Sequence, residues 1–442
     1  MPFTFLKYIQ PTHYFRLSRK DGSWIFPVPE SLPKEILEAL EKDTGFKSMK
    51  AMEYDLSWQA IKRGYIENAE TYQQFEKLPV SDEYRFLRKN FHPIWSFYVL
   101  LIRLLSFKNP VREIRGWWKH RKVKRRDYAR NSFQYPDWNT FQGKLMKEQP
   151  LVSVIIPTLN RYHYLKDILA DLEQQTYPNF EVVVVDQSQP FQSEFYKDYS
   201  LNLQFVHQET PALWLARNTA VQKAKGEIVL LSEDDVRVDP NWIENHLKCL
   251  DYFNADISAG VFYPEGSQVP KDRSYYAVAS QFATGNAALY KRVFREIGLF
   301  DRQFERQRMG DGEFGLRAYL GGMKSVSTPY ASCIDVKAPT GGLRQMGSWD
   351  AFRPKKWLAP RPIPSVLYLY RRYYGNTAAR RALLKSVPPS VIPYQFKKNK
   401  PMLILGICIS LVFLPIILWQ VFRSWKLASQ KIKQGPLISE LE

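Results

Sequence analysis

Residues 151–188 run LVSVIIPTLNRYHYLKDILADLEQQTYPNFEVVVVDQS, in which two apolar runs flank a longer segment of mixed polarity. The runs VSVIIP and EVVVVD lack the polar alternation of a half-exposed strand, so both are predicted to be strands that are buried on two faces. Between them, YLKDILADLEQQ has apolar residues at the spacing of an amphipathic helix. A strand, a helix and a second strand in this order predict two neighbouring parallel strands.

The same alternation continues downstream to about residue 330. LWLARNTAVQKAK is a predicted helix, EIVLLS a third buried strand and DPNWIENHLKCL a further helix. The sequence therefore predicts an α/β fold whose sheet is Rossmann-like, mainly parallel and flanked by helices.

Polar residues follow each of the three predicted strands. PTLNR lies at 157–161, DQSQ at 186–189 and EDDV at 233–236. The carboxyl ends of parallel strands share one edge of a sheet, and ligands bind at that edge in open sheets. The three segments are therefore expected to form one site.

Three consecutive acids, Glu233, Asp234 and Asp235, come directly after the third strand. Crowded carboxylates repel one another unless a cation neutralises them, and oxygen ligands suit Mg²⁺ or Mn²⁺. A divalent metal site is therefore predicted here; the alternative is a solvated acidic loop. Neither a Walker-type phosphate loop nor GxGxxG follows a strand, so a nucleotide would be held by the metal and by side chains.

Five motifs in order resemble the family 2 glycosyltransferases, which have the GT-A fold. They are VSVIIPTLNR, QQTYPNFEVVVVDQS, LARNTAVQKAKGEIVLLSEDDV, ATGNAALYKRVFREIGLFD and GDGEFGLRA. The resemblance covers about residues 151–349, a little under half of the chain. It implies an inverting, metal-dependent enzyme that moves a sugar from a nucleotide-diphosphate sugar to a hydroxyl of a glycan or glycolipid.

The resemblance also implies roles for individual residues. Thr158 and Asp186 would contact the base and ribose, with Arg217 nearby. The acids 233–235 occupy the place of the DxD motif, with Asp235 as the direct metal ligand and Glu233 in place of the first Asp. The residues predicted to bind nucleotide are Pro157, Thr158, Asn160, Arg161, Asp186 and Arg217. Those predicted to lie near the donor sugar and the acceptor are Gly285 and Asn286.

Asp311, in the motif GDGEFGLRA, would be the general base. The family often has Glu-Asp at this point, and Gly310 stands in place of the Glu. A weakly nucleophilic hydroxyl needs a carboxylate to take its proton, and a single base with direct displacement inverts the anomeric centre. The alternative is that Asp311 only caps the helix that follows.

Two segments predict contact with a membrane. PIWSFYVLLIRLLSF at 93–107 precedes the basic, Trp-containing run VREIRGWWKHRKVKRRDYAR, a combination that suits an anionic membrane surface. MLILGICISLVFLPIILWQVF at 402–422 has the length of a membrane helix, in which Pro415 is a possible kink; a re-entrant or interfacial helix is the alternative. The formal charge of +19 agrees with an anionic partner.

The expected location is the cell membrane, with the catalytic domain cytoplasmic. Three widely spaced cysteines indicate no disulfide framework and favour a reducing compartment. The predicted segments are a helical region of unknown role at 1–90, a membrane-proximal segment at 91–150, the GT-A domain at 151–350, a basic linker at 351–400, a membrane helix or anchor at 401–423 and a tail at 424–442.

Three other functions are considered. QMGSW at 345–349 is close to the QxxRW of processive polysaccharide synthases, but Ser348 replaces the Arg. An inactive membrane-associated scaffold is the second alternative, and a turnover assay separates it from an enzyme. Binding to nucleic acid, the third, is not expected, because it leaves the acids at 233–235 unexplained and an acidic pocket repels phosphates.

Overall fold

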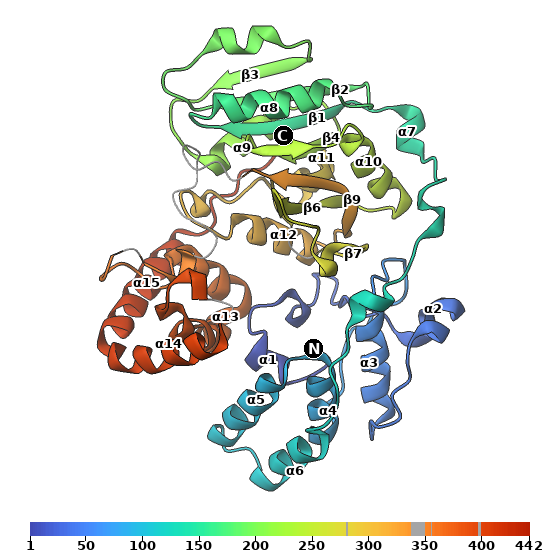
Figure 1. Ribbon diagram of the computed structural model, residues 1–442, viewed down its shortest axis with the longest axis vertical. Coiled ribbons are helices and arrows are strands. Elements are labelled where there is room, and N and C mark those ends of the chain that lie inside the picture. Colours follow the sequence, from blue (N-terminus) through green and yellow to red (C-terminus); the bar gives the residue numbers. More distant parts are fainter. Residues whose placement is uncertain (280–281, 337–349, 355, 397–398) are drawn as a thin grey trace. The chain divides into compact units, whose positions relative to one another are not determined.

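The computed structural model describes residues 1–279, 282–336, 350–354, 356–396 and 399–442. The chain forms two compact units, which are described separately (Figure 1). Unit 1 consists of Met1–Gln134 with Tyr373–Lys385, and unit 2 consists of Tyr135–Arg372 with Ser386–Glu442. Most of the predicted segment 91–150 therefore belongs with residues 1–90.

Unit 2 is built on one sheet, in which the described strands follow the order β3-β2-β1-β4-β8-β6-β9-β5, with β7 paired to β9. The strands are β1 (Val152–Thr158), β2 (Phe180–Asp186), β3 (Leu203–His207), β4 (Ile228–Ser232), β5 (Val236–Val238), β6 (Ile257–Pro264), β7 (Ala277–Val278), β8 (Asn286–Tyr290) and β9 (Ser325–Asp335).

The three strands predicted from apolar runs are present as β1, β2 and β4. β1 pairs in parallel with both of the others, as expected, and every residue of β1 and of β4 is buried. The prediction of a mainly parallel sheet is confirmed only in part, however. β2 and β3 also pair in parallel, as do β6 and β9. β8 joins β4 and β6 in antiparallel pairs, and β9 pairs antiparallel with β5 and β7, so the sheet is mixed.

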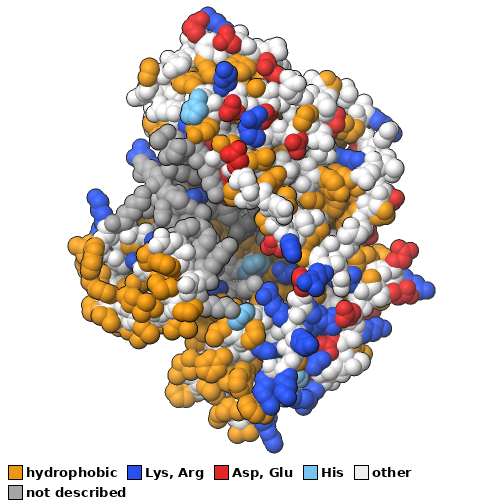
Figure 2. All heavy atoms as spheres, viewed as in Figure 1, with side chains coloured by type: hydrophobic (Ala, Val, Ile, Leu, Met, Phe, Trp, Pro, Cys, Tyr) orange, Lys and Arg blue, Asp and Glu red, His pale blue; other side chains and the backbone are white. Residues whose placement is uncertain are grey.

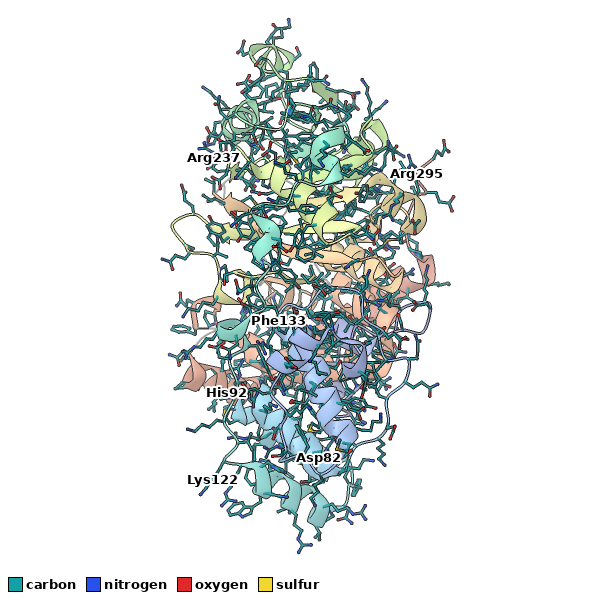
Figure 3. The ribbon with its side chains drawn as sticks, turned by 90° about the vertical axis from the view of Figure 1, so that its right-hand side faces the viewer. Asp82, His92, Lys122, Phe133, Arg237 and Arg295 are labelled. Atoms are coloured by element: carbon teal, nitrogen blue, oxygen red, sulfur yellow. The ribbon has the colours of Figure 1, made fainter. Side chains whose placement is uncertain are left out.

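Helices cover the sheet of unit 2 (Figure 1). α9 packs against β1 and β2, whereas α10 packs against β6, β8 and β9. In Figure 3, Arg237 of β5 and Arg295 of α11 lie on opposite sides of this unit. The helices of this part are α7 (Lys144–Glu148), α8 (Tyr162–Glu173), α9 (Leu213–Lys223), α10 (Trp242–Tyr252), α11 (Lys291–Ile297) and α12 (Gly310–Leu320).

The apolar run 402–422 does not form one helix. α14 (Lys400–Val412) and α15 (Leu414–Gln434) divide it, because Pro415 lies in the first turn of α15 rather than inside a continuous helix. Within the described residues no single helix has the length and apolar composition to cross a bilayer. Together the two helices have that length and composition, but the chain bends by 88° at the break between them.

The predicted tail begins later than residue 424, because α15 continues to Gln434. The residues after it pair with a loop of unit 2: Leu299 N–H donates to Ser439 O at 2.9 Å, and Arg302 N–H donates to Leu437 O at 3.1 Å. The C-terminal segment is therefore part of the unit 2 structure.

Unit 1 is helical around an aromatic core. Phe3 stacks on Phe86 with centroids 3.5 Å apart, and Phe26 stacks on Trp58 at 5.8 Å. Asp82, His92 and Lys122 of this unit are labelled in Figure 3. Its helices are α1 (Leu6–Ile9), α2 (Lys34–Ala39), α3 (Met49–Lys62), α4 (Val80–Asn90), α5 (Pro93–Leu105), α6 (Pro110–His120) and the second part of α13 (Pro364–Ser386).

Candidate functional site

The ends of β1, β2 and β4 lie side by side, as the sequence predicts. Thr158 and Asp186 are directly opposite each other in the parallel pair of β1 and β2. β4 lies on the other side of β1 and leads into Glu233–Asp235, named the acidic turn here. The Thr158 hydroxyl donates to Asp234 Oδ2 at 2.7 Å, so the first and third strand ends are in contact.

Arg161 neutralises part of the acidic turn. Its Nη1 lies 3.1 Å from Asp234 Oδ1 and 3.0 Å from Asp235 Oδ2, so one guanidinium nitrogen bridges two carboxylates. Burial raises the pKa of Asp234 to about 7 against the opposing charge of Arg161. Asp235 is less buried, and its Oδ1 has no hydrogen-bond partner among the described residues.

The third acid is held by Arg217 from α9. Arg217 is fully buried, and its Nη2 lies 3.3 Å from Glu233 Oε1. Its Nη1 donates to the backbone carbonyl of Thr284, whose hydroxyl donates to Asp311 Oδ1. These contacts connect the acidic turn to Asp311, 76 residues after Asp235 in the chain, and sequence reasoning did not identify Thr284.

Asp311 is the second residue of α12. The alternative that it merely caps this helix is wrong, because the N-cap is Met309, in the left-handed region at φ 84°, and no side chain caps the helix. Oδ2 of Asp311 has no hydrogen-bond partner among the described residues. The carboxylate is thus held through one oxygen by Thr284, and its role as a base stays a prediction.

Asp186 is deeply buried, and its carboxylate accepts hydrogen bonds from three donors of the protein. Tyr162 donates its hydroxyl to Oδ2 at 2.6 Å, and Tyr196 does so at 2.7 Å. The backbone N–H of Ser188 donates to Oδ1 at 2.8 Å. Burial and this carboxylate raise the pKa of Tyr162 to about 12, so Tyr162 stays a donor at neutral pH. Neither tyrosine was predicted; Tyr162 directly follows the NR of PTLNR, which was an available signal.

Asn160 joins the loops that follow β1 and β2. Its backbone is left-handed at φ 55°, its N–H donates to Ser188 Oγ at 2.7 Å, and its Oδ1 accepts from Gln189 N–H at 2.9 Å. Pro157 is buried in β1, opposite Val185 of β2. The contacts of these two residues with a nucleotide stay predictions.

Gly285 and Asn286 have different surroundings. A Cβ at Gly285 would lie 2.8 Å from the Glu233 side chain, so this residue allows the close approach of the acidic turn. Asn286 is fully buried, and its amide is occupied by the protein. Oδ1 accepts from Trp242 at 2.9 Å and from His246 at 2.8 Å, and Nδ2 donates to the carbonyls of Val261 and Ala331.

The donor set available to a metal is small. Within the described residues, no group of three or more His, Cys, Asp or Glu side chains is arranged to hold an ion. Asp234 is directed to Thr158 and Glu233 to Arg217, which leaves Asp235 as the candidate ligand. Asp335 lies opposite Val236 in the β5–β9 pair, next to the acidic turn. The segment 345–349 lies outside the described residues.

Residues 153–315 match the sequence model of a family described as Glycosyl transferase family 2. The chain is 27% identical over 162 residues to glycosyltransferase GlyA of Streptococcus pneumoniae serotype 4, covering 36% of this chain and 22% of GlyA. It is 27% identical over 164 residues to glycosyltransferase AglE of Haloferax volcanii, covering 35% and 53%. The chain therefore spans about a fifth and about half of the lengths of these relatives.

Two solved structures are similar to the chain. Mannosyltransferase PcManGT from Pyrobaculum calidifontis in complex with GDP-Man and Mn²⁺ has a TM-score of 0.45 at 17% identity, over 77% of this chain and 97% of that chain. S. aureus TarS 1-349 in complex with UDP-GlcNAc has a TM-score of 0.41 at 18% identity, over 64% and 92%. At these scores the likeness gives no residue of this chain a role.

Proposed function

We propose that this chain, which carries a glycosyl transferase family 2 domain over residues 153–315, transfers a sugar from a nucleotide-diphosphate sugar to a hydroxyl of a glycan or glycolipid. The observation that carries the proposal is the connection between two carboxylate groups. Arg217 and Thr284 link the acidic turn to Asp311. Such a transfer needs stabilisation of the leaving diphosphate and a base for the acceptor, and the two carboxylate groups suit these tasks.

A divalent ion, Mn²⁺ or Mg²⁺, is part of the proposal. The residues fit it, because a positive guanidinium nitrogen already lies between Asp234 and Asp235 within 3.1 Å of an oxygen of each. Asp235 would hold the ion, and the other two acids would add negative charge around it. When bound, the ion would offset the charge of the departing nucleoside diphosphate.

Asp311 would act as the base. The acceptor hydroxyl oxygen attacks the anomeric carbon while the bond from that carbon to the diphosphate oxygen breaks. The hydroxyl proton passes to Asp311, and the nucleoside diphosphate leaves. Thr284 holds Oδ1 of Asp311, which leaves Oδ2 to receive the proton. A single displacement of this kind inverts the anomeric configuration.

The nucleotide would lie along the ends of β1 and β2. Thr158 and Asp186 are opposite each other there, and the hydrogen bonds of Tyr162 and Tyr196 fix the Asp186 carboxylate in place. A ribose hydroxyl reaching Asp186 would share the carboxylate with these two phenols. Arg161 lies at the same edge and would turn toward a phosphate when a metal ion takes its place between the acids.

The proposed location is the cytoplasmic face of the cell membrane. Support comes from α14 and α15, which expose large apolar side chains in unit 2. The bend of 88° suits a re-entrant or interfacial pair better than one straight span. The exposed large apolar residues of the pair and of the break between them are Ile404, Leu405, Ile407, Leu411, Val412, Phe413, Leu414, Leu418, Trp419, Phe422, Leu427 and Ile432.

Calorimetric titration of UDP, GDP and dTDP into the full chain, with and without Mn²⁺, tests the donor site. One nucleotide is expected to bind only with metal, and Asp235→Asn is expected to abolish that binding. Asp239→Asn is the matched control, because Asp239 is exposed and lies four residues further along the chain. Equal binding by both variants would contradict the site.

Turnover is tested by release of nucleoside diphosphate in the presence of an acceptor. Asp311→Asn is expected to lower kcat by about two to four powers of ten while nucleotide binding stays intact. A folded wild-type protein that binds nucleotide but releases no product with any acceptor would favour an inactive scaffold. Products carrying many added sugars would identify a processive synthase.

A further inference from the structure

The hairpin of α5 and α6 in unit 1 has an exposed apolar face. Eight large side chains on it are 44–98% exposed, and the most exposed is Phe107, in the turn between the two helices. Figure 2 shows hydrophobic side chains gathered over these helices, with Lys and Arg side chains beside them. The eight residues are Ile94, Phe97, Leu101, Leu105, Phe107, Val111, Ile114 and Trp118.

The sequence of α6 divides its surface into three stripes, each with the spacing i, i+3, i+7. At about 100° per residue, these stripes point in three different directions. The buried stripe is Glu113, Gly116 and His120. The exposed apolar stripe is Val111, Ile114 and Trp118, and it points nearly opposite to the buried one. The third stripe, on the flank between them, is Arg112, Arg115 and Lys119.

The basic stripe of α6 lines a pocket of about 710 Å³ between α6 and the start of α4. Gly116 allows the close contact of these helices, because a Cβ there would lie 3.0 Å from the Tyr84 ring. No acidic side chain lines the pocket. Its residues are Lys47, Lys77, Leu78, Pro79, Val80, Ser81, Arg112, Arg115, Gly116 and Lys119.

The walls of this pocket, as the structure describes them, contain five cations and no carboxylate. None of them forms an ion pair with a carboxylate in the described part of the chain. Five positive side chains around one space repel one another, and an anion with several oxygens would relieve that repulsion. Arginine in particular binds phosphate oxygens through paired N–H groups.

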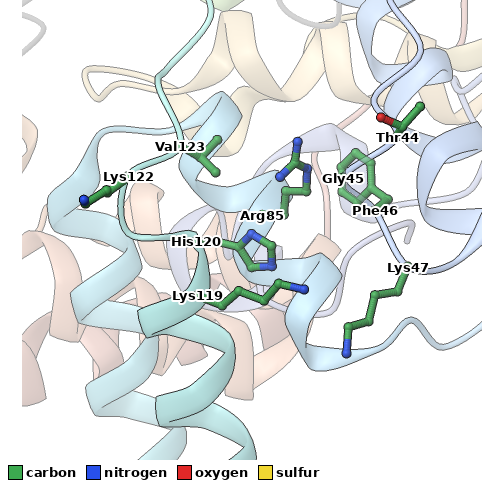
Figure 4. Close-up of a pocket in the computed structure, with 9 residues that line it drawn as sticks. All are labelled: Thr44, Gly45, Phe46, Lys47, Arg85, Lys119, His120, Lys122 and Val123. Atoms are coloured by element: carbon green, nitrogen blue, oxygen red, sulfur yellow. The ribbon is translucent and has the colours of Figure 1, made fainter.

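A second pocket of about 620 Å³ shares Lys47 and Lys119 with the first and adds Lys122 and Arg85, of which Arg85 is paired with Asp43 (Figure 4). His120 lines it and lies at 2.9 Å from Ser81 Oγ of the first pocket. Burial, with the charges of Arg85 and Lys119, lowers the pKa of His120 to about 4. Positive potential is therefore concentrated along this side of the hairpin.

A buried ion cluster fixes the hairpin to the rest of unit 1. Arg103 of α5 pairs with Glu113 of α6 at 3.2 Å and also with Glu83 of α4. Tyr84 donates to the same Glu113 oxygen at 2.8 Å. Because the cluster joins three helices, the apolar stripe and the basic pocket keep a constant relation to each other.

We propose that the α5–α6 hairpin inserts its apolar face into the interfacial layer of a membrane and that the adjoining basic pocket binds the phosphate of an anionic lipid headgroup. The outward stripe enters the acyl region, where it needs no polar partner, and the flanking stripe meets the headgroups. Binding of a nucleic acid would explain the cations of the pocket, but it would leave the eight apolar side chains exposed. The inference is independent of sugar transfer, because all of its residues belong to unit 1.

A dye at residue 107 of the full chain tests the insertion. Phe107→Cys in a Cys408→Ser background carries an environment-sensitive fluorophore. Cys249 and Cys333 are buried and do not compete for the label. We expect a blue shift of the dye with vesicles of phosphatidylcholine containing about one-third phosphatidylglycerol, and a smaller one with phosphatidylcholine alone. A dye that stays in water with both vesicles while the protein floats with them would overturn the proposal, because α14 and α15 would then bind alone.

The pocket is tested with Arg112→Gln, Arg115→Gln and Lys119→Gln together. We expect about a hundredfold weaker partitioning to the anionic vesicles, because each basic residue near such a surface contributes about 1 kcal/mol. The matched control changes Lys20, Lys34 and Lys42, three exposed lysines of the same unit, to glutamine. Equal losses in both triple variants would overturn the pocket in favour of diffuse charge.

Inorganic phosphate and pyrophosphate separate a lipid from a soluble anion. Binding of either one to the wild type without any dye shift on vesicles would identify a site for free phosphate and overturn the lipid assignment. Circular dichroism checks that each variant is folded. Nucleotide binding at the unit 2 site is expected to be unchanged in all of them, so the two proposals fail or stand separately.

Discussion

Gly310 is explained by a side chain from another helix. The indole of Trp214, from α9, occupies the space that a Cβ at position 310 would need, and its Nε1–H donates to Phe304 O at 3.1 Å. An acid at position 310, as the family resemblance implies, would therefore collide with this ring. The Trp214 ring is thus compatible with glycine at this position, and Asp311 lies beside Thr284.

His246 is a buried neutral residue in the core of unit 2. Because Asn286 Oδ1 can only accept, the His246 nitrogen Nε2 carries the proton, and Nδ1 accepts from Ser258 Oγ at 2.9 Å. Burial lowers its pKa to about 4. The unfolded chain therefore takes up a proton at this residue before the folded one does as the pH falls.

A loss of stability on acidification follows from His246. We expect it to begin near pH 6.5 and to continue to about pH 4, at about 1.4 kcal/mol per pH unit, with no contribution above pH 6.5. His246→Gln starts less stable but lacks this slope. Urea unfolding of both proteins at several pH values gives the difference, in which the shared effects of His13 and His120 cancel. Parallel curves for the two proteins would contradict the prediction.

At the scale of elements, helix α9 depends on a distant carboxylate. Its N-cap is Ala212, which has no side chain for capping. Glu305, about 90 residues later, accepts the N–H of Trp214 at 3.2 Å and that of Leu215 at 2.8 Å. The same helix carries Arg217 to the acidic turn, so Glu305 supports the site through the backbone.

Glu305→Ala is expected to lower the free energy of unfolding by about 1–2 kcal/mol, the usual loss for a helix cap that also leaves buried N–H groups without partners. Thermal and urea denaturation measure it. Glu296→Ala on α11 is the control, because Glu296 is about half exposed and pairs, within the described residues, with Arg292 of its own helix. A change no larger than that of the control would show that α9 does not need this cap.

Local sequence patterns predict some of the strands and helices but not others. β1, β2 and β4 are apolar runs with flanking helices, and periodicity predicts them. β5 has three residues and β7 has two. Both form because they pair with the backbone of β9. No local pattern contains that information. Pro415 did indicate the break between α14 and α15. Proline has no N–H to donate within a helix, but it suits the first turn of one.

On the scale of the whole molecule, α13 carries the chain from unit 2 into unit 1. The units divide between Arg372 and Tyr373, and the helix is interrupted at Gly375, where φ is 81° and ψ is 166°. Only glycine adopts this backbone conformation without strain. Nothing lies within 4 Å of the position that a Cβ there would take, so conformation alone requires glycine.

Gly375→Ala is expected to lower the free energy of unfolding by about 1–3 kcal/mol through backbone strain. Thr377→Ala, an exposed change two residues further along the same segment, is expected to leave stability unchanged or to raise it slightly. Denaturation of both variants beside the wild type decides this. An unaffected Gly375→Ala protein would mean that the helix runs through this point in solution.

The sequence by itself determined the parallel strands and the edge at which their polar residues gather. Apolar runs of six or seven residues have to be buried, and parallel pairing brings their carboxyl ends together. It also indicated the acidic turn, Asp311 and two segments of apolar and basic composition, for which membrane contact stays a prediction.

Only the tertiary structure decided how these groups are held. Several contacts join residues from different elements. Arg161 lies between two carboxylates, Thr284 donates to Asp311, two tyrosines donate to Asp186, and Trp214 packs over Gly310. Such contacts depend on how elements pack, which no window of sequence records. The antiparallel strand pairs and the basic pocket beside α6 arise in the same way, from groups that meet only after the chain has folded.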